Sequence, residues 1–399
     1  MRELLETRAG RAYAAAAAVV VVVAAVGLVV LWPGDVEPKL GQIYSGDTER
    51  AEVTGIEEFA CSSEFSDDVC ANLTIRIETG PDEGTETLLR NLGATGGPLP
   101  PGIGVGDRVR VAPNAEIPGQ SADLATQYTL TDFERRSQML WLAIGFCALV
   151  ILFARLRGAL SLVGLAVSLA LILVFIVPAI LDGQDPVWVA IFGALAIMIA
   201  TLSLAHGVNA KSLAAMLGTT ASLALVALLA SLFTDVTSLT GLSSEEATTL
   251  VFNDVVSQPS LRGLLLAGMV IGALGVLDDV TVSQASTVIA LRSANPDLGF
   301  SELYGRAVRV GRDHVSATVN TLVLAYVGAA LPTLLILTSS DIGISQGANF
   351  EIVAQEIVAA LVGSIGLIAA VPLTTALTAS LAVRVRPEQL GPSEAGHVH

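Results

Sequence analysis

Charged side chains are scarce in this sequence. Asp, Glu, Lys and Arg make up 15% of its 399 residues, whereas soluble globular domains carry about 25%. Lysine is nearly absent and occurs only as Lys39 and Lys211. This composition argues against an ordinary soluble enzyme, and the 53% of hydrophobic residues also argues against intrinsic disorder. The net charge of −16, without a dominant basic cluster, disfavours a nucleic-acid binder.

Recognisable catalytic motifs are also missing. The sequence has no zinc-protease pair of histidines, no phosphate-binding lysine loop and no nucleophilic serine elbow. His206 and His314 stand at the ends of apolar stretches, and His397 and His399 stand in a polar tail. We therefore predict that the protein is not an enzyme and that it holds no metal ion or other cofactor.

Long apolar runs are what the sequence does contain. A helix of roughly 20 apolar residues crosses the 30 Å core of a bilayer. Eight stretches meet this length, at about 13–31, 138–155, 159–181, 187–205, 212–233, 261–283, 315–338 and 360–383. A signal peptide is the alternative for the first stretch. An uncleaved anchor is favoured because Trp32 and Pro33 stand where a small-residue cleavage site is expected.

The basic residues of the short loops predict the orientation, because Lys and Arg accumulate on the cytoplasmic side. They fall on one side if both termini are cytoplasmic. These residues are Arg2, Arg8, Arg11, Arg155, Arg157, Lys211, Arg292, Arg306, Arg309, Arg312, Arg384 and Arg386. The short outer loops carry only Arg262. We expect a multi-pass protein of the plasma membrane with both ends in the cytoplasm.

Residues 33–137 separate the first two spans and have a different composition. They hold 19 acidic and 8 basic residues, which is most of the net charge. Short alternating stretches predict strands near 50–56, 73–78, 85–89, 108–111 and 127–131. Five short strands in about 100 residues suit a small β-barrel, OB-like in topology. We expect a scaffold or a surface that docks a partner protein.

Two of the three cysteines lie in this outer segment. Cys61 and Cys70 are nine residues apart, and an oxidising compartment allows them to pair. We predict a structural disulfide between them. Cys147 stands alone in the second span, where a small packing residue is expected.

An acidic pair in or near the sixth span is the most informative polar feature. Gly268, Gly272, Gly275 and Asp279 follow an i, i+4, i+7, i+11 spacing, which is one face of a helix. Because small residues let a neighbouring helix approach closely, this spacing predicts that Asp279 lies on a packed face. Asp278 then lies about 100° away. The alternative is a capping pair at the cytoplasmic edge of the span.

The seventh span offers a polar partner for these acids. Asn320 lies a few residues above its cytoplasmic end, at a depth similar to that of Asp279, so a hydrogen bond between them is expected. Just before this span, residues 301–312 form an amphipathic pattern, which predicts a separate helix on the inner leaflet. Asp278, Asp279 and Asn320 together are the candidate intramembrane site.

Several motifs resemble the YibE/F-like family of bacterial multi-pass membrane proteins over roughly residues 135–385. They are His206 to Lys211, Gly275 to Val282, Gly311 to Asp313, Asn320 to Gly328, Leu331-Pro332 and Gly363 to Pro372. The resemblance implies a multi-pass inner-membrane protein but assigns no substrate and no catalytic residue. A glycine-rich span that ends in paired acids is also similar to the SecD/SecF and RND pattern. That similarity implies proton movement through the acids and cargo binding by the outer domain.

These observations predict a mainly α-helical, polytopic bundle of about eight spans with one extracytoplasmic β-rich domain. The expected parts are a first anchor in 1–32, the outer domain in 33–137, the membrane domain in 138–385 and a polar cytoplasmic tail in 386–399. We expect a transporter-like or export-associated protein that is proton-coupled through the acidic pair. The alternative is a non-transporting envelope factor whose outer domain docks a partner protein. The expected partners are the bilayer and a protein, with no nucleic acid.

Overall fold

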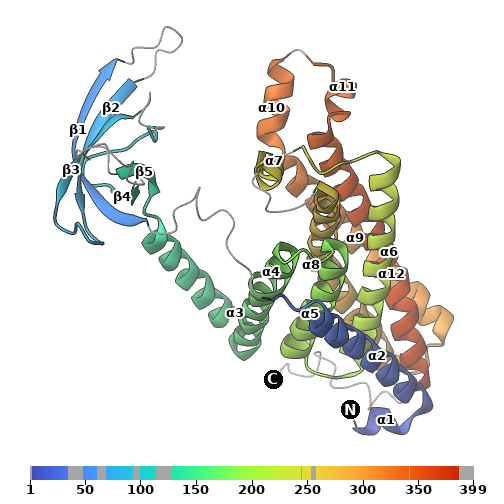
Figure 1. The fold of residues 1–399 in the computed structure, drawn as a ribbon. Helices are drawn as coiled ribbons and strands as arrows, with labels where there is room; N and C mark the ends of the chain where they lie inside the picture. The colour runs from blue at the N-terminus through green and yellow to red at the C-terminus, as the bar shows by residue number, and fades with distance from the viewer. Residues whose placement is uncertain are drawn as a thin grey trace. The chain divides into compact units, whose positions relative to one another are not determined.

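The computed structural model describes residues 2–34, 48–60, 69–92, 99–113, 128–243, 245–252, 258–340 and 342–385. The chain divides into two compact units, one of residues 38–149 and one of residues 1–37 with 150–399. Figure 1 shows the elements of both units.

The smaller unit contains a five-stranded antiparallel sheet. Its strands are β1 (Glu49–Ala60), β2 (Val69–Ile77), β3 (Glu86–Leu92), β4 (Arg108–Pro113) and β5 (Tyr128–Phe133), in the order β3-β2-β1-β4-β5. Each overlaps a stretch that the alternation of apolar and polar residues predicted. Alternate residues such as Val53, Ile75 and Val109 are fully buried, so one face of the curved sheet forms the core. The strands therefore build a β half-barrel.

Cys70 lies buried in β2 of this unit and is part of a disulfide. Its predicted partner, Cys61, lies outside the described residues, so the pairing itself stays a prediction. Cys147 is a free thiol.

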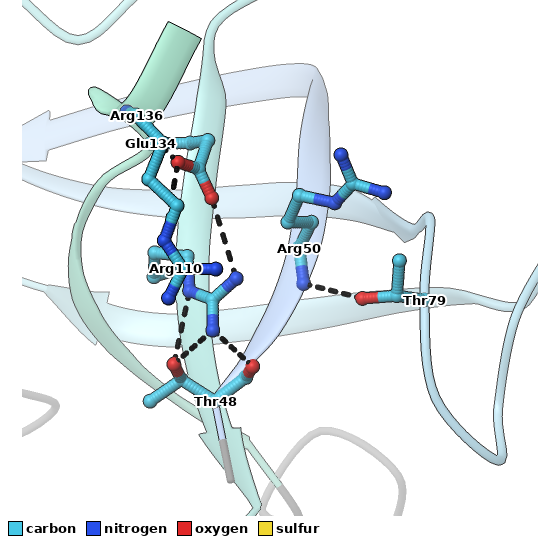
Figure 2. A network of polar contacts seen from close by, with 6 residues as sticks. All are labelled: Thr48, Arg50, Thr79, Arg110, Glu134 and Arg136. Carbon is cyan, nitrogen blue, oxygen red and sulfur yellow. Dashed lines mark hydrogen bonds and ion pairs between the residues drawn. The ribbon is translucent and has the colours of Figure 1, made fainter. Parts of the chain in front are cut away.

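A polar network ties strand β4 and the residue before β1 to the start of helix α3 (Arg136–Leu171), as Figure 2 shows. The Arg110 side chain donates through Nε to Thr48 Oγ1 at 2.9 Å and lies 3.3 Å from the Glu134 carboxylate. Glu134 also accepts the backbone N–H of Arg136 at 3.0 Å. Because the Arg110 and Glu134 side chains are only 15% and 8% exposed, water screens this ion pair poorly.

The pKa of the Glu134 carboxyl is lower than usual. Burial raises this pKa, but the Arg136 N–H and the Arg110 and Arg136 guanidinium groups together lower it more. The ionised carboxylate therefore stabilises the fold fully above its ordinary pKa of 4.5. This stabilisation is lost as the pH falls through the lower value of the folded state.

Replacing Glu134 with Gln should destabilise the half-barrel, because it leaves Arg110 poorly paired in a half-buried site. At neutral pH we expect a loss of about 1–3 kcal/mol in the free energy of unfolding. Hydrogen exchange of the β4 and β5 peptides in the full-length protein would measure it. Glu83→Gln, at an exposed turn, is the matched control. The difference between the two variants should shrink as the pH falls below 4.5, and equal exchange at pH 7 would contradict the prediction.

The larger unit consists of helical elements, and Figure 1 labels all of them except η2. They are α1 (Arg2–Glu6), α2 (Arg8–Val30), η2 (Ile172–Ile176), α4 (Val177–Leu181), α5 (Pro186–His206), α6 (Ala210–Val236), α7 (Glu245–Phe252), α8 (Gln258–Ala294), α9 (Phe300–Ala329), α10 (Leu331–Ser339), α11 (Ile344–Ala348) and α12 (Glu351–Arg384). Among the described residues, six helical stretches are long and apolar enough to cross a membrane. A seventh is added if α9 and α10, which are bent by 59°, count as one span.

The difference from the predicted eight spans arises in the stretch that starts with α3. The expected spans 138–155 and 159–181 fall within one helical stretch, Arg136–Leu181, of 46 residues. At 1.5 Å per residue this stretch would be about 69 Å long, twice the thickness of a bilayer core. Arg155 interrupts it with φ 52° and ψ −131°, which is not helical backbone.

The turn between α5 and α6 explains one of the sequence motifs. Gly207 ends α5 with φ 68°, a left-handed conformation that favours glycine. Asn209 then starts α6 with a capping box, in which its side chain and that of Ser212 each accept the other's backbone N–H. The run from His206 to Lys211 therefore builds a tight helix–helix turn.

Helix α8 packs against α5, α6, α9 and α12. Residues that recur every three or four positions along α8 form one buried face. Its members are Ala267, Val270, Leu274, Leu277, Thr281, Gln284, Ala285 and Val288. The stripe of Gly268, Gly272 and Gly275 lies beside this face and is exposed. A Cβ atom built on Gly268 or Gly275 meets no other atom within 4 Å, so these glycines do not mediate packing within the described chain.

Helices α2 and α9 are also integrated into the bundle. Tyr13 of α2 donates from Oη to the Leu377 carbonyl of α12 at 2.7 Å. In α9, Leu303, Ala307 and Gly311 are buried at four-residue spacing. The expected separate amphipathic helix at 301–312 is therefore the first part of one longer helix. Its apolar side packs against α8 and α12.

Candidate functional site

The three residues of the expected polar site do not share one environment. Asp278 is half-buried, whereas Asp279 and Asn320 are exposed. Among the described residues, no hydrogen bond joins Asn320 to either acid. Asp278 adjoins the buried face of α8, and Asp279 lies on the exposed side with the glycines. The acid that lies inside the bundle is therefore Asp278, whereas the glycine spacing indicated Asp279.

Asp278 faces helix α5. Its Oδ2 accepts a hydrogen bond from Thr201 Oγ1 at 3.2 Å. Its Oδ1 is buried and has no hydrogen-bond partner within the described part of the chain. An unpaired carboxylate oxygen away from water is costly, so this atom needs a proton, a water molecule or a cation.

Thr281 lies one turn further along α8 and connects Asp278 to α6. Its Oγ1 is 3.0 Å from the Asp278 carbonyl oxygen and 2.6 Å from Thr219 Oγ1. Thr219 Oγ1 is in turn 3.0 Å from the Ala215 carbonyl oxygen. Two hydroxyl hydrogens serve these three contacts, so one contact must lack a donor. The network therefore has more than one arrangement of its hydrogens.

Gln284 continues the polar positions by one more turn. It is 4% exposed. Its Nε2 donates to the Ala307 carbonyl of α9 at 2.9 Å and to Thr375 Oγ1 of α12 at 2.7 Å. We call the resulting set the polar row. It consists of Asp278, Thr281 and Gln284 of α8 with Thr201, Thr219 and Thr375.

Further hydroxyls are buried in the same helices. Ser222 Oγ on α6 and Ser364 Oγ and Thr374 Oγ1 on α12 lack hydrogen-bond partners among the described residues. Unpaired buried hydroxyls are uncommon in native proteins. The buried surfaces between α6, α8 and α12 are therefore more polar than the hydropathy of these helices indicates.

The chemistry of the polar row is limited to one carboxylate, one amide and several hydroxyls. Within the described ranges, no three His, Cys, Asp or Glu side chains gather so as to hold a metal ion. Asp278 forms no ion pair with a described basic residue. A row of this kind can bind and pass a proton or hold a weakly bound monovalent cation.

The family comparison covers this site. The model of the YibE/F-like protein family matches residues 142–384. The chain belongs to the YibE/F-like family. The matched range contains every residue of the polar row and none of the β half-barrel. No curated protein matches the chain, and no solved structure does.

Sequence reasoning missed most of the polar row in this YibE/F-like protein. Thr201, Thr219 and Thr375 lie within apolar helices, where a threonine hydroxyl often only bonds back to its own helix. A signal was present on α8, where Asp278, Thr281 and Gln284 recur every three residues along an apolar segment. That spacing places three polar groups along one side of a helix.

Proposed function

We propose that this YibE/F-like protein is a transporter of the plasma membrane in which Asp278 carries the coupling proton. The observation that carries the proposal is the buried Asp278 Oδ1, which lies without a hydrogen-bond partner between packed helices. Ionisable residues inside spans are expensive to keep and usually mark an ion or proton pathway. The Thr281 hydroxyl contacts the backbone carbonyl of Asp278, so the hydrogen-bonding neighbour of the carboxyl group itself is Thr201 Oγ1.

The proposal includes eight crossings. The break at Arg155 and the 46-residue length of Arg136–Leu181 support two crossings within that stretch. The bent pair of α9 and α10 supplies another. Eight crossings keep both termini and the α8–α9 loop on the cytoplasmic side, where the basic residues of the short loops accumulate.

Cysteine labelling tests this orientation. In a background with Cys147→Ala, Asn295→Cys in the α8–α9 loop should react with a membrane-impermeant maleimide only after the cells are permeabilised. Gln184→Cys, between α4 and α5, should react in intact cells and serves as the matched control. Labelling of position 295 in intact cells would refute the orientation.

We also propose that the half-barrel has an OB-like topology. The strand order β3-β2-β1-β4-β5, with β3 approaching β5, supports a partly closed barrel of that topology. In a transporter this domain would engage cargo on the outer side. In the alternative, a non-transporting envelope factor, the same domain would dock a partner protein.

Solute analysis of a deletion strain tests the transport function. Cells that lack the protein should accumulate, or fail to accumulate, at least one solute relative to complemented cells. A variant that lacks residues 48–134 but keeps the spans separates the two functions. Solute levels that are identical in all strains, together with a phenotype from the domain deletion alone, would favour docking over transport.

A further inference from the structure

A cavity lies between the second half of α9, α10, α11 and the first half of α12. Its volume is about 370 Å³, which is within the range of about 300–1,000 Å³ that is usual for small-molecule sites. Most of its walls are apolar side chains, such as Val323, Leu334 and Leu361. No residue of the polar row lines it, so this is a second, separate site.

A helix break creates the cavity. Helices α9 and α10 meet at 59°, and Pro332 stands in the first turn of α10. A proline at this position cannot donate to the preceding turn, so the chain leaves the direction of α9 here. Leu337 and Gly347 approach each other between α10 and α11. Because of this bend and the shortness of α11, a space remains beside α12, and this space is the cavity.

Few polar groups reach the cavity. Thr338 lines it, but its hydroxyl already donates to the Leu334 carbonyl at 2.7 Å. Glu356 of α12 and Tyr326 of α9 remain. Glu356 is the one charged side chain among the described lining residues, and it forms no ion pair with a described Lys, Arg or His.

We propose that this cavity binds a lipophilic organic cation. The apolar walls stabilise a hydrocarbon body by removing it from water. The Glu356 carboxylate supplies the opposite charge, which the protein itself leaves unpaired. The Tyr326 ring offers a second favourable surface for a cation. A neutral acyl chain would leave the charge of Glu356 unneutralised, and an organic anion would be repelled.

The position of the cavity bears on access. It lies at the ends of α9 and α12 that are remote from Arg306, Arg309 and Arg384. In the orientation proposed above, it therefore belongs to the outer half of the bundle. A cation at the extracytoplasmic surface of the membrane could reach the cavity without crossing the bilayer.

Binding of tetraphenylphosphonium to the full-length protein in nanodiscs tests the proposal. Equilibrium dialysis should give saturable binding of one cation per chain. Glu356→Gln, which keeps the shape of the side chain, should weaken this binding at least tenfold. Glu246→Gln, an exposed acid on α7, removes the same charge elsewhere and should bind as the wild type does.

Tetraphenylborate controls for shape, because it is an anion of nearly the same size. It should neither bind saturably nor displace the cation. Ala348→Phe, which narrows the cavity, should also abolish cation binding. Equal affinity of the wild type and Glu356→Gln, or equal binding of the anion, would overturn the proposal. Asp278→Asn should keep full cation binding, so failure of this site and failure of the proposed transport role are distinguishable.

Discussion

Asp278→Asn should reduce transport to the level of the deletion strain, whereas Asp279→Asn should leave it nearly unchanged. Asparagine keeps the size of the side chain and can still accept the hydrogen bond that Thr201 Oγ1 donates at 3.2 Å. The asparagine side chain cannot gain or lose a proton near neutral pH. Asp279 is exposed about 100° away around α8, so its neutralisation leaves the hydrogen bonds of the polar row in place.

The measurement is the level of the affected solute in a deletion strain that expresses each variant. Size-exclusion chromatography of both purified variants should show the elution profile of the wild type, which separates lost function from lost folding. Full activity of Asp278→Asn would refute proton coupling at this residue and leave a hydrogen-bonding role. Loss of activity in Asp279→Asn alone would return the site to the glycine face of α8.

Gly311→Leu should strongly destabilise the bundle, while Gly305→Leu on the same helix should not. A Cβ atom at Gly311 would lie 2.6 Å from Gln284 Oε1 and 2.6 Å from Val371 Cγ1. Gln284 cannot easily yield, because its Nε2 already donates to Ala307 and Thr375. Overpacking of this kind costs about 1–3 kcal/mol, and sometimes more. At Gly305 nothing lies within 4 Å of the added atom.

Thermal unfolding of the purified proteins in one detergent would measure this difference. Both substitutions replace glycine in a helix, which by itself favours the helix by up to about 1 kcal/mol, so the control isolates the contact. The double variant Gly311→Leu/Gln284→Ala should recover part of the lost stability, since it removes the atom that the leucine meets. Equal melting temperatures of the two leucine variants would contradict the prediction.

Much of the fold could be predicted from local sequence. Membrane residence depends on the length of apolar runs, and the strands depend on alternation over four to seven residues. Both are properties of neighbouring residues, so they survive without knowledge of the tertiary structure. The capping box at Asn209 and Ser212 is equally local. The family assignment also rests on motifs that can be read directly.

The choice of the packed face of α8 could not be predicted in this way. Successive residues of a helix are 100° apart, so a shift of one position exchanges the buried Leu274 and Leu277 face for the exposed Gly272 and Gly275 face. Small residues permit close packing but do not require it. Packing against the side chains of α6 and α12 determined which face of α8 is buried.

The sequence by itself determined that this is a membrane protein of the YibE/F-like family with a five-stranded domain between its first helices, because length, alternation and short motifs are local. Only the tertiary structure decided that Asp278 rather than Asp279 enters the bundle and that Thr201, Thr219 and Thr375 join it. It also decided that Glu356 lines an apolar cavity at the bend near Pro332. These relations depend on contacts between helices far apart in the chain, which no local pattern encodes.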